Sequence, residues 1–97
     1  KNLKAIKQAL LEINQVVTPL LNELQKIRPK KKVEKLAKLI SDIGKKYKIT
    51  PLEKHGMELL MATESFNIEN EKNLINKLPR VIDSLKELID KKNRSTS

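Results

Sequence analysis

The chain has 97 residues, with 21 Lys and Arg against 12 Asp and Glu, which gives a formal net charge of +9. It contains no Cys, one His and two Gly, and aromatic residues make up 2% of it. This length limits the chain to one domain, the lack of Cys excludes disulfides and thiolate metal sites, and one His excludes a His-rich site. So few Gly and aromatic residues disfavour a β-sandwich or barrel, while the net charge raises nucleic acid or an acidic membrane as the first candidate partner.

Two further features bear on the context of the chain. No apolar run approaches the roughly 18 residues that a transmembrane helix needs, and no signal peptide is recognisable. The chain begins at Lys1 rather than at methionine, so we expect it to be processed or cut from a longer protein. Proline residues divide it into amphipathic helical blocks.

The first block covers residues 3–27. Its apolar residues recur every three or four positions, as on one face of a helix: Leu3, Ile6, Leu10, Ile13 and Val17. Thr18 followed by Pro19 is typical of a helix N-cap and first helical position, and the apolar stripe resumes at Leu20, Leu24 and Ile27. The pattern leaves open whether the block is two helices or one bent helix, since proline permits either.

The central blocks are two predicted helices. Arg28–Pro29 marks a break, and a helix is predicted over residues 31–47. Its apolar stripe comprises Val33, Leu36, Ala37, Ile40, Ile43, Gly44 and Tyr47. Thr50-Pro51-Leu52-Glu53 predicts a capping box at the start of the next helix. That helix is expected to end near Phe66 and to bury Leu52, Gly56, Leu59, Leu60 and Thr63.

The last block begins at Asn67, which is a suitable cap. Its apolar positions are Ile68, Leu74, Leu78, Val81, Ile82, Leu85 and Leu88, and Pro79 is expected to kink or divide the helix. We predict a single domain over residues 1–92 and a disordered tail over residues 93–97. The predicted fold is all-α, an antiparallel up-down four-helix bundle, with an extra N-terminal helix as a variant.

The positive charge is concentrated in one region. Residues 26–48 hold ten of the Lys and Arg residues and two of the acidic ones, whereas residues 49–90 hold five and eight. The helical spacing places Lys31, Lys35, Lys38, Asp42 and Lys45 on one solvent-facing stripe. Such a stripe is either a solvated face or a docking surface for an acidic protein or for phosphate. Nucleic acid is the weaker option, because single-strand binders use aromatic platforms and Tyr47 and Phe66 are expected to be buried or half-buried.

Catalysis within this chain is not expected. His55 lies beside the apolar stripe of its helix, which favours a packing role over that of a base or phosphoacceptor. The carboxylates of that helix form no paired set, and Met57 and Met61 are expected to fill the core. No metal site, cofactor or small-molecule substrate is predicted.

Three segments resemble the histidine-containing phosphotransfer domain of hybrid sensor histidine kinases. VEKLAKLISDIGKKYKITPLEKHGMELL has the rhythm of that family's helix, short turn and following helix. ELLMATESFNIENEKNLINKLPRVIDSLKEL resembles its closing segment, with Ala62, Phe66 and Ile68 followed by Leu78-Pro79. TPLLNELQKI resembles the helix that precedes this pair.

The chain departs from the motif of this family, which is His, Lys three residues later, and Gly at the next position. With Leu52 in register, Lys38 stands at the His position, Ser41 at the Lys position and Asp42 at the Gly position. Aligning Gly44 with the family Gly instead places Ile40 at the His position. Lysine does not form the phosphoramidate that such a relay needs, so Lys38 is a non-functional equivalent of the acceptor.

The resemblance therefore implies a degenerate, non-enzymatic signalling module. It would dock a response-regulator receiver domain or serve a structural role in a cytoplasmic part of a membrane-anchored sensor kinase. The expected docking residues are Lys31, Lys35, Lys38, Ser41, Asp42 and Lys45. Phosphotransfer through His55 is a further reading. The alternatives are a free-standing helical binding or immunity-type protein and a basic binder of nucleic acid or anionic surfaces; the oligomeric state stays open.

Overall fold

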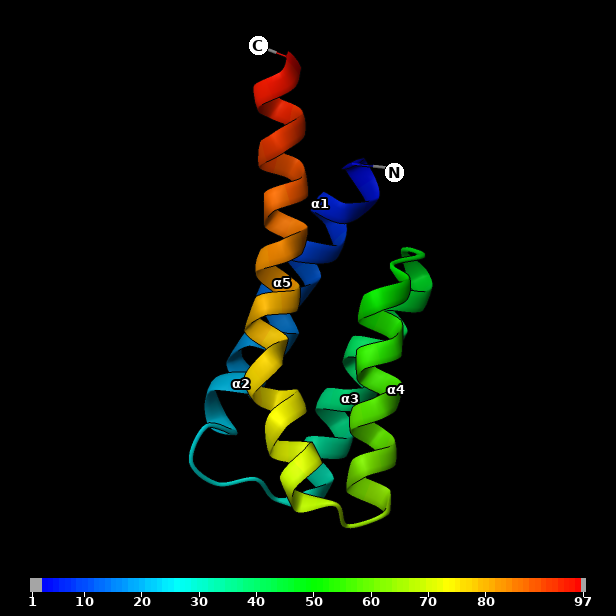
Figure 1. Cartoon of the computed structure of the whole chain (residues 1–97), viewed down its shortest axis with the longest axis vertical. Helices are drawn as coiled ribbons and strands as arrows, with labels where there is room; N and C mark the ends of the chain where they lie inside the picture. Colours follow the sequence, from blue (N-terminus) through cyan, green and yellow to red (C-terminus); the bar gives the residue numbers. More distant parts are fainter. Residues whose placement is uncertain (1–2, 97) are drawn as a thin grey trace.

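The computed structural model describes residues 3–96, with side chains up to Lys91, and this part of the chain is all-helical, without strands (Figure 1). The elements are α1 (Leu3–Glu12), the π-helical segment η1 (Ile13–Val17), α2 (Thr18–Glu23), α3 (Lys30–Lys46), α4 (Thr50–Glu64) and α5 (Ile68–Thr96). The predicted all-α class is confirmed, and the elements are compatible with a helical bundle.

Helices α1 and α2 belong to one continuous helical rod, with η1 between them. The Thr18 N–H donates to the carbonyl of Ile13, five residues earlier, so the turn before Pro19 is wider than an α-helical turn. A wider turn accommodates the proline ring, which crowds the preceding turn of a regular helix. Thr18 itself has helical backbone angles (φ −58°, ψ −45°). The prediction that Thr18 caps a separate helix is therefore wrong.

The end of α3 is closed by the backbone rather than by a side chain. The Ile49 N–H donates to the carbonyl of Gly44 at 2.7 Å, and the Lys48 N–H donates to that of Lys45 at 3.3 Å. This pair of bonds is the Schellman motif, in which the residue after the helix takes a left-handed conformation. That residue is Lys48, with φ 57°, although glycine is the usual occupant of such a position.

The end of α4 repeats this motif at Phe66, which also has φ 57°. The Asn67 N–H donates to the carbonyl of Ala62 at 2.8 Å, and the Phe66 N–H donates to that of Thr63 at 3.2 Å. Asn67 then caps α5, because its side-chain Oδ1 accepts the N–H of Asn70 at 3.1 Å. The predicted Asn67 cap is confirmed.

The predicted capping box at Thr50 is wrong. Ile49 occupies the N-cap position, Thr50 is already helical, and no side chain caps α4. Instead, the carbonyl of Ile49 accepts the N–H groups of Leu52 and Glu53, each at 3.1 Å. Because the Schellman turn fixes Ile49 one residue before Thr50, the threonine hydroxyl lies one position too late to cap the helix.

Helix α5 is continuous through Pro79, so of the two expected effects of this proline, a kink or a division of the helix, division is excluded. Pro79 is exposed, and its ring therefore meets solvent rather than a neighbouring helix. At 29 residues, α5 is about 43 Å long, close to the longest dimension of the molecule, 47 Å. The helix includes residues 93–96 of the predicted tail, whereas Ser97 lies outside the described residues.

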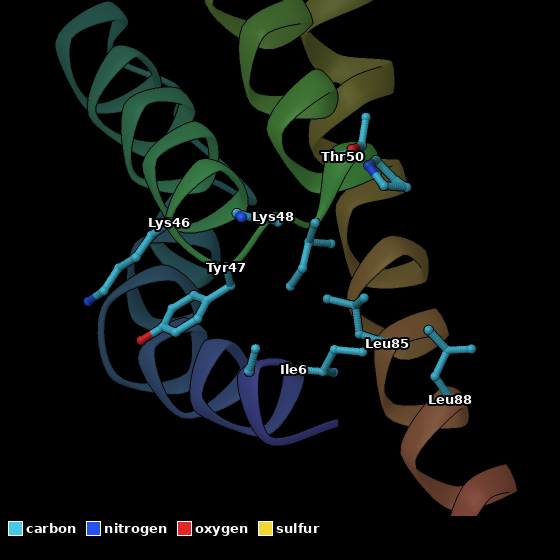
Figure 2. A pocket seen from close by; sticks show the side chains of 10 residues that line it. Ile6, Lys46, Tyr47, Lys48, Thr50, Leu85 and Leu88 are labelled. Carbon is cyan, nitrogen blue, oxygen red and sulfur yellow. The ribbon is translucent and has the colours of Figure 1, made fainter. Parts of the chain in front are cut away.

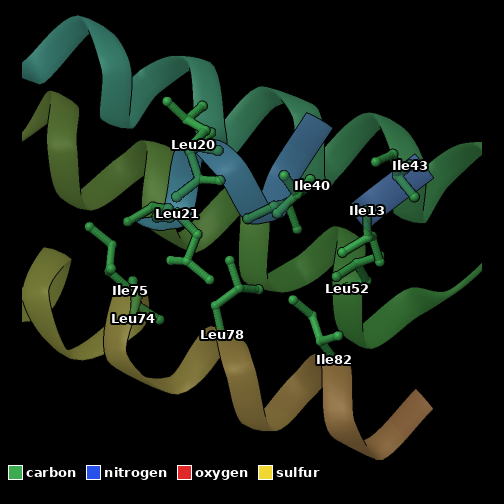
Figure 3. Close-up of a cluster of buried hydrophobic side chains, with 14 of the residues drawn as sticks. Ile13, Leu20, Leu21, Ile40, Ile43, Leu52, Leu74, Ile75, Leu78 and Ile82 are labelled. Atoms are coloured by element: carbon green, nitrogen blue, oxygen red, sulfur yellow. The ribbon is translucent and has the colours of Figure 1, made fainter. Parts of the chain in front are cut away.

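The core receives apolar side chains from every helix (Figure 3). The largest fully buried ones are Ile13, Leu24, Leu36, Ile40, Leu52, Leu59, Ile75 and Leu78. The stripes predicted for α3 and α4 are buried, except that Tyr47 and Leu60 are half-buried. The predicted stripes therefore identify most of the residues that hold the helices together.

Several apolar residues lie on the surface, against expectation. Met61 is 67% exposed, Phe66 72% and Ile68 75%, and Met57, Ile27 and Leu88 are also exposed. Met57 and Met61 fall on the side of α4 opposite Gly56 and Leu59, which pack inward. The predictions that the two methionines fill the core, that Phe66 is at least half-buried and that Ile27, Ile68 and Leu88 continue the buried stripes are wrong.

Candidate functional site

The candidate site is the outer side of α3, which we call the lysine face and define by the predicted docking residues Lys31, Lys35, Lys38, Ser41, Asp42 and Lys45. Its orientation is set by the inner side of α3, where Val33, Leu36, Ala37, Ile40, Ile43 and Gly44 are buried. Burial of that apolar stripe turns the four lysines and Asp42 into solvent, and all five are exposed.

The structure brings most of the lysine face together around a shallow surface groove of about 440 Å³. Its lining residues are Lys31, Glu34, Lys35, Lys38, Leu39 and Asp42. Ser41 and Lys45 do not line this groove. Glu34 and the half-buried Leu39 were missed in the sequence analysis, although each lies three or four positions from Lys31 or Lys35, a spacing that places side chains side by side on a helix.

The cations of the lysine face differ from Lys32 and Lys46 in forming no ion pair with a carboxylate of the described residues. Among the described residues, the ion pairs of this region are Lys32 with Glu23, at 2.7 Å, and Lys46 with Glu12, at 3.0 Å. Lys32 holds the pKa of the Glu23 carboxyl below its ordinary value by hydrogen bonding and charge. None of the four lysines of the face forms an ion pair with a described carboxylate, although Lys35 also lowers the pKa of Glu23 through its charge. Their ammonium groups therefore remain available to an anionic partner.

Helix α3 is held against α4 at backbone distance. A Cβ added at Gly56 would lie 2.6 Å from the Ser41 nitrogen and 2.7 Å from the Ala37 oxygen, and one added at Gly44 would lie 2.3 Å from the Glu53 nitrogen. These approaches are possible only without side chains at the two positions. They leave Ser41 half-buried beside α4, so Ser41 lies at the edge of the lysine face rather than at its centre.

The C-terminal end of α3 is tied to α1 by a polar cluster. The Tyr47 hydroxyl donates a hydrogen bond to Glu12, whose carboxylate also accepts from Lys46 at 3.0 Å. The Tyr47 hydrogen bond, followed by that of Lys46, lowers the pKa of Glu12. The same carboxylate raises the pKa of Lys46 and of Tyr47. The cluster fixes the end of the lysine face relative to α1.

His55 lies away from the lysine face, on the side of α4 that packs against α5. Its ring is buried, and its Nε2 lies 2.7 Å from the carbonyl oxygen of Leu74. Because a carbonyl oxygen only accepts, Nε2 carries the proton and donates. Phosphorylation at this nitrogen would require the hydrogen bond to break and the ring to leave the interface.

A second buried polar contact joins α4 to α5, and the sequence analysis did not find it. The Thr63 hydroxyl donates to the Glu71 carboxylate at 3.0 Å, and both residues are buried. Neither residue belongs to the lysine face or lines its groove. The contribution of this contact is therefore to the packing of the two helices.

The described residues contain no group of three or more His, Cys, Asp and Glu placed to hold a metal ion. Over the same part of the chain, the helices are too short or too polar to cross a bilayer. The comparisons with protein-family models, with curated proteins and with solved structures found no match to this chain. What the site can do therefore follows from its own geometry, which is that of a cationic surface on a rigid helix.

Proposed function

We propose that this chain is a non-catalytic signalling module of a two-component hybrid sensor histidine kinase, which docks a response-regulator receiver domain through the lysine face. In this proposal the helices form an antiparallel up-down bundle like that of a histidine-containing phosphotransfer domain, in a cytoplasmic part of the parent kinase. The observation that supports it is the set of four exposed, unpaired lysines on the outer side of α3.

The chemistry of a receiver domain fits this surface. Its phosphorylation site is rich in aspartate. The groove presents the cations Lys31, Lys35 and Lys38 with the anions Glu34 and Asp42, so it keeps a net positive charge that is complementary to such a site. Exposed charge pairs accelerate association and fix orientation more than they add affinity. We therefore expect weak, salt-sensitive binding rather than a permanent complex.

Docking would occur without transfer of a phosphoryl group to this chain. Lys38 stands at the position equivalent to the acceptor and cannot replace an imidazole, and His55 is buried with Nε2 engaged by Leu74. The module would thus hold a receiver near the parent kinase, or compete for it, while leaving the phosphoryl group on the receiver.

The proposal is tested by titrating the chain with purified receiver domains from the response regulators of its source cell, at about 50 mM and 300 mM salt. We expect binding that weakens at higher salt and is lost in the double variant Lys35→Glu/Lys38→Glu. Lys72→Glu/Lys77→Glu is the matched control, because both lysines are exposed on α5 and the change in net charge is the same. No binding at low salt, or equal losses in both variants, contradicts the proposal.

Duplex DNA in the same salt series addresses the competing reading of the basic region. Phosphate contacts release counterions, so DNA binding by the lysine face would show a steep dependence on salt. The only described aromatic side chains are Tyr47, engaged with Glu12, and Phe66, contacted by Lys30 at 4.2 Å from its ring centroid. Neither aromatic side chain lies on the lysine face. At about 50 mM salt we therefore expect DNA to bind no more tightly than a receiver domain does.

A further inference from the structure

A second groove, separate from the lysine face, opens where the turn between α3 and α4 meets α1 and α5 (Figure 2). Its volume is about 630 Å³, and its lining includes Ile6, Lys46, Tyr47, Lys48, Leu85 and Leu88. This volume falls within the range of about 300–1,000 Å³ that is typical of small-molecule sites. Nothing in the proposed receiver docking uses it.

The walls of this groove are apolar and come from three separate parts of the chain. Ile6 of α1 and Leu85 of α5 point toward each other across it, and Leu88 extends the α5 wall by one turn (Figure 2). Ile6 and Leu85 are almost fully buried, whereas Leu88 is 48% exposed. A ligand lying along this wall would remove the exposed part of Leu88 from water, which favours an apolar ligand body.

The polar groups of the lining are cationic or neutral, and none is a carboxylate. Lys46 and the Tyr47 hydroxyl are both engaged by Glu12, so the charge of Lys46 is already balanced. Lys48 forms no ion pair with the described carboxylates. One uncompensated positive charge therefore lies at the edge of an apolar groove, and Thr50 beside it offers a hydroxyl donor.

Lys48 also occupies a backbone position that a side chain normally avoids. Its φ of 57° is left-handed, which costs a non-glycine residue on the order of 1 kcal/mol. Glycine would relieve this cost and would close α3 equally well. The ammonium group at the groove is thus present at the expense of stability, which accords with a role for that charge.

We propose that this groove binds a single-chain amphiphile with a carboxylate head, of the fatty-acid class. The acyl chain would lie between Ile6, Leu85 and Leu88, and the carboxylate would pair with Lys48. A monoanion matches the one lysine without an ion pair among the described residues of the lining. This inference is independent of receiver docking, because the two surfaces share no residue.

The test is a titration of the whole chain with dodecanoate below its micellar concentration. Tyr47 is the only Tyr and the chain has no Trp, so its fluorescence reports directly on the groove, with calorimetry as a second measurement. We expect saturable binding of one dodecanoate per chain. Dodecylammonium has the same tail and the opposite charge, and we expect no saturable binding of it.

Three variants locate the binding. Lys48→Gln removes the paired charge and is expected to weaken dodecanoate binding about fivefold, the scale of an exposed ion pair. Leu88→Asp places a carboxylate on the apolar wall at a half-exposed position and is expected to weaken it about tenfold or more. Lys38→Gln changes the net charge as Lys48→Gln does, but on the lysine face, and is expected to leave binding within twofold of the parent chain.

Four results would overturn the proposal. These are no saturable binding of dodecanoate, equal binding of dodecylammonium, insensitivity to both Lys48→Gln and Leu88→Asp, and equal weakening by Lys38→Gln. Sedimentation measurements of the oligomeric state show whether a second copy of the chain, rather than an amphiphile, occupies the groove. If the chain is a dimer at about 50 μM that Leu88→Asp converts to a monomer, the groove is a subunit interface and the proposal is wrong.

Discussion

Gly56 of α4 lies against the backbone of Ser41 in α3, so closely that a Cβ at position 56 would be 2.6 Å from the Ser41 nitrogen. A contact with backbone cannot be relieved by a side-chain rotation, so any larger residue must push the two helices apart. Because Ser41 belongs to the lysine face, this contact joins the packing of the bundle to the position of the proposed docking surface.

Gly56→Ala is expected to destabilise the chain by up to about 2 kcal/mol. Overpacking a close contact costs about 1–3 kcal/mol, and the intrinsic preference of helices for alanine offsets about 1 kcal/mol of that cost. Urea unfolding followed by circular dichroism measures the change. Ser84→Ala, at an exposed position on α5, is the control and should change the free energy of unfolding by no more than about 0.5 kcal/mol. A Gly56→Ala chain as stable as the parent would show that the helices do not approach so closely.

The polar cluster of Glu12, Lys46 and Tyr47 predicts that the free energy of unfolding falls at both acidic and alkaline pH. The pKa of Glu12 is lowered in the folded chain, so its contribution is present above the unfolded value of about 4.3 and is lost as the pH falls through the folded value. The pKa of Tyr47 is raised, so that contribution is present below about 10 and is lost as the pH rises further. Urea midpoints measured from pH 2 to 11 in the parent chain and in Glu12→Gln should differ most near neutrality, and the difference should shrink as the pH falls through the lowered pKa of Glu12. A constant difference across this range would contradict the cluster.

Glycine at the left-handed positions should stabilise the chain. Lys48→Gly is expected to raise the free energy of unfolding by about 0.5–1 kcal/mol, because glycine adopts φ 57° without strain. Phe66→Gly should gain less, since it also removes the contact of Lys30 with the ring, 4.2 Å from its centroid. Thermal unfolding of the two variants would show the order, and a loss of stability in Lys48→Gly would contradict the left-handed assignment.

The buried contact between Thr63 and Glu71 predicts a cost for removing the donor alone. Thr63→Val keeps the shape of the side chain but leaves the buried carboxylate without the hydroxyl that donates to it at 3.0 Å. The expected loss is about 1–3 kcal/mol. In a double-mutant cycle with Glu71→Ala, which removes the acceptor, the two losses should not add. Additive losses would show that the two side chains do not interact.

The helices themselves were predictable because proline and apolar spacing mark them strongly. The break at Pro29, the buried stripe of α3 and the cap at Asn67 all follow from local chemistry. The failures arose where tertiary or backbone geometry decides. The Schellman turn at Lys48 could not be predicted, because it lacks the glycine that usually marks such a turn. It shifts the start of α4 so that Thr50 lies inside the helix. Pro19 announces a disturbance of the preceding turn, but it permits either a new helix or a widened turn, and the sequence does not choose between them.

The exposed and buried sides of α4 could not be separated by spacing alone. Met57 and Met61 recur as regularly as Leu52 and Leu59, and the choice between them depends on the close approach of Gly56 to α3. The lysine face was predicted correctly in its exposure, because charged residues opposite an apolar stripe must face solvent. The groove around the lysine face was not predicted, because nothing in the sequence distinguishes Leu39 and Glu34 as lining residues before the side chains are placed.

Backbone amide shifts in a ¹⁵N-labelled chain report directly whether an acidic receiver domain docks on the outer side of α3. On addition of a receiver domain at about 50 mM salt, we expect the largest shifts on residues 31–45 and nearly unchanged amides over residues 68–91. Shifts concentrated on α5, on the exposed Met57–Met61 side of α4, or on no residue at all would contradict it.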